Sequence, residues 1–261
     1  LGAASHVQRK SGCGDMVIAT KFLKLGHWGY VAARQAARTV GVEKRLRKYL
    51  GPIAGRLAYK VASDAGKPVA VRGHTMFLSL PGRYPPLALA ADRYEIETTT
   101  LFESLVKPGM AVLDIGAHVG YFSLLAARGT GPTGKVYAFE PEPQNYELLL
   151  KNIEMNEYTN VVATQMAVSN KVGSATLFLT GLDNGRHSTY QHGLPERGSV
   201  AVETTTVDAF LAAEGWPRID LAKVDVEGAE MVVLDGMSQL LDKSWDLKLI
   251  IEFSPSLLSS A

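Results

Sequence analysis

Two glycines that follow a short apolar run are the first residues whose types and spacing suggest a binding site. Asp114, Gly116 and Gly120 occur in the order Asp-x-Gly-x-x-x-Gly within residues 112–120, and an apolar amphipathic segment begins directly after Gly120. This order predicts a strand, a tight turn and a helix start, where backbone approaches a ligand closely and free N–H groups of the helix face it. The motif indicates a nucleotide-type cofactor on a parallel α/β sheet.

The acids around this turn favour one cofactor over another. A dinucleotide site normally carries three glycines as Gly-x-Gly-x-x-Gly, whereas only Gly116 and Gly120 are present here. Glu140 ends the next apolar run, where a carboxylate would accept hydrogen bonds from the two ribose hydroxyls of an adenosine. Asp114 would repel a pyrophosphate and attract a cation. S-adenosylmethionine, with a sulfonium, an ammonium and no phosphate, is therefore favoured over NAD, unless Asp114 only caps the turn and Glu140 is a solvated strand end.

A second group of acids lies in residues 223–230 and could act on a methyl acceptor. Asp225 should lie at the carboxyl tip of the fourth strand, with Glu227 in the following turn and Glu230 in the first turn of the next helix. An alcohol must lose its proton near the transition state of methyl transfer, and a placed base contributes roughly 10²–10⁴-fold. Asp225 and Glu227 are candidate bases or substrate binders, whereas Glu230 should support the helix N-terminus. A turn cap and a solvated loop acid are the alternatives for Asp225 and Glu227.

Two histidines and a further acid are weaker candidates. His187 lies in a polar loop and could serve as a base at neutral pH, although a surface histidine is the simpler interpretation. His118 lies within the glycine turn and is interpreted as a residue of the turn that does not act as a base. Glu252 ends the fifth predicted strand and could hold Mg²⁺ together with Asp225. These scattered acids are too few for a metal site to be predicted.

The elements that must position these residues alternate regularly after residue 110. Alternating strands and helices predict βαβ units and a mostly parallel sheet, with ligands at the carboxyl ends of the strands. A polar insertion at about 172–205, with short strands at 175–179 and 200–205, interrupts the alternation and should be functional. Strands are predicted at 110–115, 135–140, 161–166, 221–226 and 247–253, and helices at 119–128, 143–156, 207–214 and 229–241.

The chain before residue 110 is built differently. Residues 1–60 hold twelve Lys and Arg against two acids, a balance of +10 that leaves −9 for the remainder. Residues 1–20 are predicted to be a flexible tail, 21–66 a basic helical accessory segment, 67–109 a hairpin and connector helix, and 110–261 the core. The basic helices should either pack on the core or contact a membrane surface or lipid-linked glycan. Sequence-specific nucleic-acid binding is not expected, because the segment contains no recognisable nucleic-acid-binding motif.

The bulk composition limits the class of protein. At 261 residues with 46% hydrophobic and 20% charged residues, the chain is an ordinary globular one of a single large domain with an accessory segment. Cys13 is the single cysteine, which excludes an intrachain disulfide and a cysteine-based metal site. No bilayer-spanning stretch or signal peptide is visible, so a cytoplasmic protein is predicted. Only eight residues follow Phe253, which predicts a truncated sheet edge at the C-terminus.

Three motifs together resemble the FkbM family of S-adenosylmethionine-dependent methyltransferases. They are residues 112–124, residues 137–141 and residues 223–230, and the resemblance covers about 69–254. It implies a class I methyltransferase (Rossmann-like) fold and, as a rule, O-methylation of a small-molecule or glycan hydroxyl. An NAD-type oxidoreductase and a non-catalytic scaffold that docks through its basic helices remain the alternatives.

The predicted site follows from the motifs and this resemblance. The predicted catalytic residues are Asp225, Glu227 and His187. The predicted cofactor-binding residues are Glu95, Asp114, Gly116, Ala117, Gly120, Tyr121, Glu140, Pro141, Ala167 and Asp225.

Overall fold

The computed structural model describes residues 67–78, 89, 94–180, 187–189, 196–244 and 246–252. The chain divides into two compact units, Leu1–Tyr94 and Glu95–Ala261. The predicted tail and basic helical segment, residues 1–66, lie outside the described residues, as do most of the insertion's polar loop and residues 253–261.

The first unit contains the predicted hairpin. Strand β1 (Val69–Val71) pairs antiparallel with β2 (His74–Met76), and Val71 lies opposite His74. Arg72 and Gly73 form the two-residue turn, with φ of 48° and 84°. Positive φ at both central positions matches the right-handed twist of a hairpin. The predicted hairpin is confirmed.

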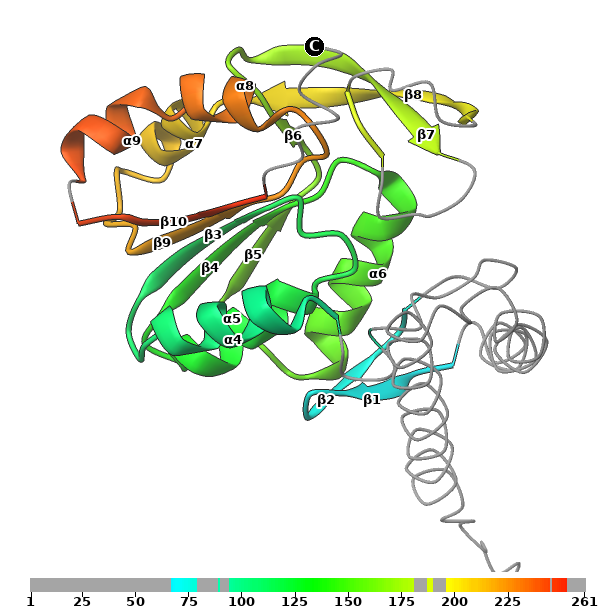
Figure 1. Ribbon diagram of the computed structural model, residues 1–261, viewed down its shortest axis with the longest axis vertical. Helices are drawn as coiled ribbons and strands as arrows, with labels where there is room; N and C mark the ends of the chain where they lie inside the picture. The colour runs from blue at the N-terminus through cyan, green and yellow to red at the C-terminus, as the bar shows by residue number, and fades with distance from the viewer. Residues whose placement is uncertain are drawn as a thin grey trace, which may run out of the picture. The chain divides into compact units, whose positions relative to one another are not determined.

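The second unit is built on a parallel five-stranded sheet in the order β10-β9-β3-β4-β5 (Figure 1). All four neighbouring pairs are parallel. The central strands are apolar and almost wholly buried, as expected where helices cover both faces. The strands are β3 (Ala111–Ile115), β4 (Lys135–Phe139), β5 (Val161–Thr164), β9 (Leu221–Val224) and β10 (Lys248–Ile251).

Helices cover the sheet in two layers. On one face lie α4 (Ile96–Leu105), α5 (Tyr121–Thr130) and α6 (Pro143–Met155), and on the other α7 (Val207–Ala213), α8 (Glu230–Asp235) and α9 (Ser238–Lys243) (Figure 1). The larger core cluster joins the second layer to the sheet, with Leu113, Ile115 and Phe139 packed with Val233 and Met237. The predicted class I methyltransferase fold, a parallel sheet flanked by helices, is confirmed.

The predicted insertion forms a second, three-stranded sheet. Strand β8 (Glu196–Thr205) lies between β7 (Gly173–Thr180), its antiparallel partner, and the short β6 (Ala167–Val168), which runs parallel to it. Leu177 and Val202 pack with Ala167 between these strands. Both strands of the insertion are longer than predicted because their alternation continues into polar residues at the ends.

One predicted helix is divided in two. Residues 229–241 form α8 and α9, separated at Gly236 and Met237. The carboxylate of Asp208 accepts hydrogen bonds from the backbone N–H groups of Gln239 (2.9 Å) and Leu240 (3.0 Å) and so caps the start of α9. A Cβ at Gly236 would overlap the carbonyl oxygen of Ser169, which fixes the chain at the break.

No helix among the described residues is long and apolar enough to cross a membrane.

Candidate functional site

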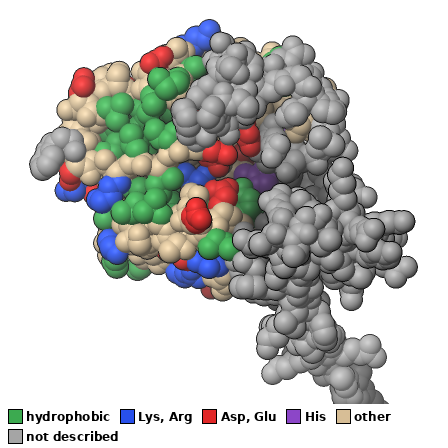
Figure 2. All heavy atoms as spheres, viewed as in Figure 1, with side chains coloured by type: hydrophobic (Ala, Val, Ile, Leu, Met, Phe, Trp, Pro, Cys, Tyr) green, Lys and Arg blue, Asp and Glu red, His purple; other side chains and the backbone are tan. Residues whose placement is uncertain are grey.

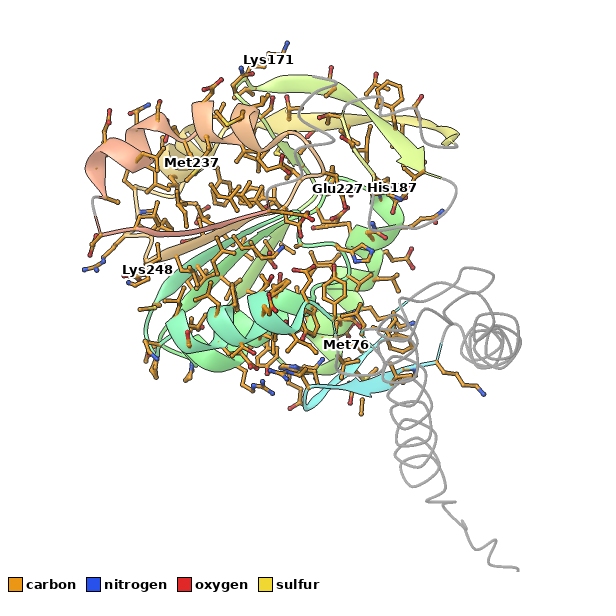
Figure 3. The ribbon with its side chains drawn as sticks, in the orientation of Figure 1. Met76, Lys171, His187, Glu227, Met237 and Lys248 are labelled. Carbon is orange, nitrogen blue, oxygen red and sulfur yellow. The ribbon has the colours of Figure 1, made fainter. Side chains whose placement is uncertain are left out.

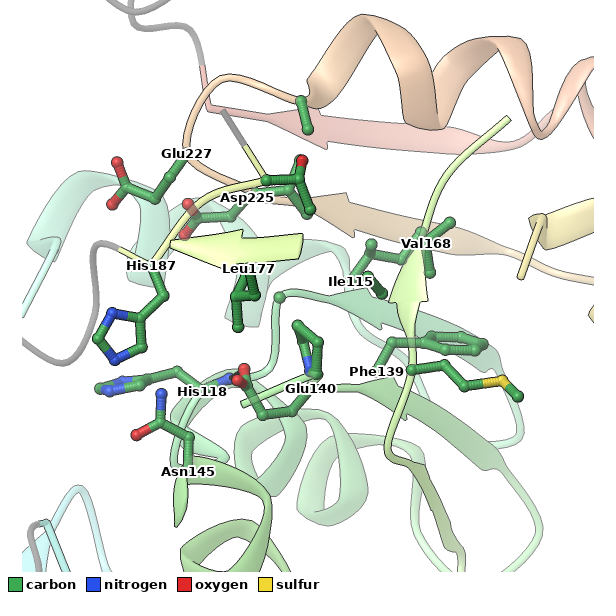
Figure 4. A pocket seen from close by; sticks show the side chains of 17 residues that line it. Ile115, His118, Phe139, Glu140, Asn145, Val168, Leu177, His187, Asp225 and Glu227 are labelled. Carbon is green, nitrogen blue, oxygen red and sulfur yellow. Dashed lines mark hydrogen bonds between the residues drawn. The ribbon is translucent and has the colours of Figure 1, made fainter. Parts of the chain in front are cut away.

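A cleft opens at the carboxyl ends of β3, β4 and β9, beside the second sheet (Figure 4). It encloses about 590 Å³ of empty space, part of it open solvent. One wall is apolar, with Phe139, Val168 and Leu177. The titratable side chains that line it are Glu140, Asp225, Glu227, His118 and His187. Figure 2 shows acidic and histidine side chains gathered together on one part of this face.

The glycine turn brings β3 and β9 into close contact. Gly116 has φ of 86°, and a Cβ there would overlap the backbone carbonyl oxygen of Asp225. Gly120 begins α5 with φ of 91°, and a Cβ there would lie 2.7 Å from the Leu149 side chain. Both positions therefore require glycine, for the backbone conformation and for the space.

The N–H groups of this turn are already used within the protein. Those of Gly116 and Ala117 donate to the carbonyl oxygen of Phe139, at 3.0 and 2.8 Å, and that of Gly120 donates to Ala117. The His118 N–H donates to the carboxylate of Glu140 at 2.8 Å. A phosphate-binding turn keeps such groups for its ligand. The four N–H groups of Gly116, Ala117, His118 and Gly120 are thus used within the protein, which suits a ligand without phosphates.

Glu140 lies at the end of β4, where it was predicted, and it is 5% exposed. One carboxylate oxygen accepts the N–H of His118 and the other accepts the N–H of Glu142 at 3.0 Å. Burial raises the pKa of Glu140 to about 7, although these hydrogen bonds favour the ionised form. The Asn145 side chain also hydrogen-bonds this carboxylate. Because a carboxylate has about four lone-pair sites, Glu140 can still accept a hydrogen bond from a ligand's hydroxyl group.

Asp114 is fully buried beneath the turn and is not among the residues that line the cleft. Its Oδ2 accepts a hydrogen bond from the Ser123 hydroxyl at 2.6 Å. Its neighbour across the sheet is Lys223, which is opposite it in the register of β3 and β9. Burial raises the pKa of Asp114, and the Lys223 charge opposes that rise. Its other oxygen, Oδ1, is buried and has no hydrogen-bond partner among the described residues, so a contact of Asp114 with a cofactor stays a prediction.

Asp225 and Glu252 are the first residues after two neighbouring strands. Asp225 follows β9 and Glu252 follows β10, and their backbone N–H groups donate to Ile115 and Val224. The Lys223 ammonium lies 2.6 Å from Oδ2 of Asp225. Burial favours the neutral acid, but Lys223 and a hydrogen bond from Glu252 outweigh it and lower the pKa of Asp225. The hydrogen bond to Asp225, with burial, raises the pKa of Glu252, so the pair shares one proton that resides on Glu252.

Glu227 and His187 approach the cleft from different elements (Figure 3). Glu227 has φ of 51°, a conformation that costs a non-glycine residue about 1–3 kcal/mol and is found at functional sites. Its carbonyl oxygen accepts a hydrogen bond from the Ser188 hydroxyl at 2.7 Å. The Nδ1 atom of His187 accepts the N–H of Thr180 at 3.2 Å. The insertion is thus tied to the loop after β9, and it brings the predicted His187 to the predicted Asp225 and Glu227.

Glu230 stabilises the loop that carries Glu227. Its Oε1 accepts the N–H groups of Gly228 (3.0 Å) and Val226 (3.3 Å). This is the helix-terminus role that the sequence predicts for Glu230.

The remaining predicted cofactor residues fall into three groups. Pro141 and Ala167 line the cleft. Ala117 and Tyr121 are buried but do not line it, and the Tyr121 hydroxyl is hydrogen-bonded to Thr99 at 3.2 Å. Glu95 is exposed, precedes α4 with φ of 41°, and acts on the site through its charge.

The sequence-based prediction missed Lys223 and Asn145. Asn145 lines the cleft from the first turn of α6, and no motif singles it out. Lys223 has a detectable signal, because it is a lysine within the apolar run Leu221–Val224 of a buried strand. Lysine is almost never fully buried without a partner. A lysine in a buried strand therefore predicts an acidic side chain close to it.

The chain is similar to several known methyltransferases. The chain is 32% identical over 167 residues to the methyltransferase sdnD of Sordaria araneosa, covering 52% of this chain and 62% of that protein. It is 27% identical over 129 residues to the hexuronic acid methyltransferase AglP of Haloferax volcanii, covering 49% and 50%. A solved FkbM methyltransferase from Methylobacillus flagellatus is 14% identical, with a TM-score of 0.39, over 63% of this chain and 41% of that one.

The chain thus spans about half to three-fifths of the length of these curated relatives. The family model for the methyltransferase FkbM domain matches residues 114–259, which is more than half of the 261 residues. The match begins at Asp114 and includes Glu140, Asp225 and Glu227. The chain belongs to the FkbM methyltransferase family.

Proposed function

We propose that this chain transfers the methyl group of S-adenosylmethionine to a hydroxyl group of a small molecule or glycan. The observation that carries the proposal is the ionised Asp225 carboxylate, which faces the cleft directly beside the Gly116 turn. An acceptor hydroxyl must lose its proton as it attacks, and a carboxylate next to the cofactor turn is a suitable proton acceptor. The family to which the chain belongs supports methyl transfer, and the relative AglP is named for a sugar acid.

The residues of the cleft fit S-adenosylmethionine. Glu140 offers acceptor lone pairs for ribose hydroxyls, and the apolar wall of Phe139, Val168 and Leu177 suits an adenine ring. Asp225 and Glu227, the acids on the other side of the cleft, suit the positive charges of a sulfonium and an ammonium. When bound, this cofactor supplies an electrophilic methyl group. The chain's own part is to align the acceptor, which contributes up to ~7–11 kcal/mol, and to accept its proton at Asp225.

Glu227 and His187 would position the acceptor in this proposal. Glu227 is part of the loop that Ser188 and Glu230 stabilise, and His187 lies beside it on the insertion. These side chains offer hydrogen-bond groups on the side of the cleft next to Asp225.

The function is tested with a panel of hydroxyl acceptors, namely neutral hexosides, hexuronides and phenols, each paired with its deoxy analogue. We expect acceptor-dependent formation of S-adenosylhomocysteine and the gain of one CH₂ by the acceptor in mass spectrometry, with no product from the deoxy analogue. Binding of NADH but not of S-adenosylmethionine in calorimetry would contradict the proposal and favour an oxidoreductase.

Cofactor affinity should depend on pH through Glu140. If only the ionised carboxylate binds the ribose well, a pKa of about 7 makes S-adenosylhomocysteine bind about tenfold more weakly at pH 6 than at pH 8. Affinity therefore rises as the pH rises through 7. Calorimetric titrations at both pH values measure the ratio.

The matched variant for this test is Glu140→Gln. It should bind S-adenosylhomocysteine more weakly at both pH values and show no pH dependence between them. It has one acceptor oxygen for the two N–H groups of His118 and Glu142, so its folding is checked by thermal denaturation. A tenfold pH effect that persists in Glu140→Gln would show that Glu140 is not the titrating group.

A further inference from the structure

Lys223 is a buried cation at the centre of the site. Its side chain is 4% exposed, and its ammonium lies 2.6 Å from Oδ2 of Asp225 and 4.5 Å from the centre of the Phe122 ring. Its register partner on β3 is the buried Asp114. Burial opposes the charged ammonium, but Asp225 and Asp114 more than offset this and raise the pKa of Lys223. The Lys223 ammonium thus interacts electrostatically with two carboxylates, that of Asp114 beneath the glycine turn and that of Asp225 in the cleft.

The acids on the acceptor side lie as close together as the ligands of a metal ion. Carboxylate oxygens of Asp225, Glu227 and Glu252 all lie within 4.8 Å of one another. Three negative charges at this separation repel strongly in a partly buried site. The Lys223 ammonium on Asp225 reduces that repulsion here. One Asp225 oxygen, Oδ2, is therefore already paired with a cation.

We propose that Lys223 is the built-in counter-cation of Asp225, Glu227 and Glu252, occupying the place of a divalent metal and positioning the Asp225 carboxylate in the cleft. Lys223 is on β9, two residues before Asp225, and its ammonium donates a hydrogen bond to the Asp225 carboxylate. The β3–β9 register also places Lys223 beside Asp114, and the Phe122 ring covers its ammonium. Lys223 thus acts through Asp225 and is a positioning residue. The inference rests on the proposed function only for the role of Asp225.

Removal of this ammonium should create a metal site. Lys223→Met keeps an unbranched side chain of similar length but leaves the acids without a cation, and divalent ions prefer such carboxylate oxygens. We expect Lys223→Met to bind Mn²⁺ at least tenfold more tightly than the natural chain in titrations with MnCl₂ alone, followed by electron paramagnetic resonance. Lys223→Arg should restore the weak binding of the natural chain, because it restores the positive charge.

Two further variants keep the test decisive. Lys248→Met, an exposed lysine at the far end of the neighbouring strand β10, is the control and should bind Mn²⁺ as the natural chain does (Figure 3). If Lys223→Met does not fold, the double variant Lys223→Met with Asp114→Asn removes the buried unpaired acid as well, and the same gain in Mn²⁺ affinity is expected of it. The measurement needs no methyl acceptor, so its failure is distinct from failure of the proposed methyl transfer.

Either of two results overturns the inference. One is binding of Mn²⁺ to the natural chain with a dissociation constant below about 10⁻⁴ M, which is tighter than weak carboxylate calcium sites. The other is an unchanged Mn²⁺ affinity in a folded chain that lacks the Lys223 ammonium.

Discussion

Asp225→Asn should lower the turnover number for methyl transfer by roughly 10²–10⁴-fold, the usual contribution of a placed general base. The amide keeps the size of the side chain and cannot accept the acceptor's proton. Binding of S-adenosylhomocysteine should change less than tenfold, because the ribose contact proposed for Glu140 is untouched. Turnover is measured as S-adenosylhomocysteine released with the hydroxyl acceptor that the panel identifies, and affinity by calorimetry.

The control for this prediction is Asp235→Asn, an exposed aspartate at the end of α8. It makes the same chemical change outside the cleft and should leave turnover within twofold. Asp225→Asn also leaves Lys223 without its nearest carboxylate, so both variants are compared by thermal denaturation. A folded Asp225→Asn protein that retains a tenth or more of natural turnover would show that Asp225 is not the base.

The fold could be predicted from the sequence because its signals are local. The apolar runs that end at Asp114 and Glu140 each form a buried strand, and the pattern that follows each one predicts the next helix. Pro143 at the first position of α6 agrees with the predicted start of that helix. The family motifs then predicted which strand ends carry the functional acids.

The details that were missed depend on contacts between distant segments. The break between α8 and α9 is set by the Asp208 carboxylate, 30 residues away from Ser238 in sequence. The buried position of Asp114 depends on its pairing with Ser123 and on Lys223 across the sheet. Short-range periodicity contains no information on such partners, because they come from other elements.

The same reasoning explains why the site was predicted only in part. Asp225 and Glu227 follow from the end of one strand, and their position is local. The approach of His187 depends on a hydrogen bond between Ser188 and Glu227, 39 residues apart. The turn motif also predicted free N–H groups, whereas the carbonyl of Phe139 and the carboxylate of Glu140 accept three of them.

Gly116→Ala should be the most damaging single change at the turn, lowering the affinity for S-adenosylhomocysteine at least 100-fold or unfolding the chain. The methyl group would overlap the carbonyl oxygen of Asp225, and φ of 86° adds about 1–2 kcal/mol of backbone strain for any residue with a Cβ. Relief of the overlap requires β3 and β9 to separate at their carboxyl ends. That movement displaces the cofactor turn and Asp225 together, and overpacking of a buried site costs a further ~1–3 kcal/mol.

Gly131→Ala separates the two causes of this effect. Gly131 also has positive φ, 65°, but a Cβ there would meet no described atom within 4 Å. With ψ of −174°, Gly131 lies in a region that essentially only glycine adopts. The variant should therefore show only the strain, a loss of about 1–3 kcal/mol in the free energy of unfolding, with unchanged affinity for S-adenosylhomocysteine. Urea denaturation and calorimetry on both variants make the comparison. If Gly116→Ala binds and unfolds like Gly131→Ala, the contact between the turn and Asp225 does not hold the cleft together. A large difference instead shows that one glycine couples the cofactor turn to the catalytic strand.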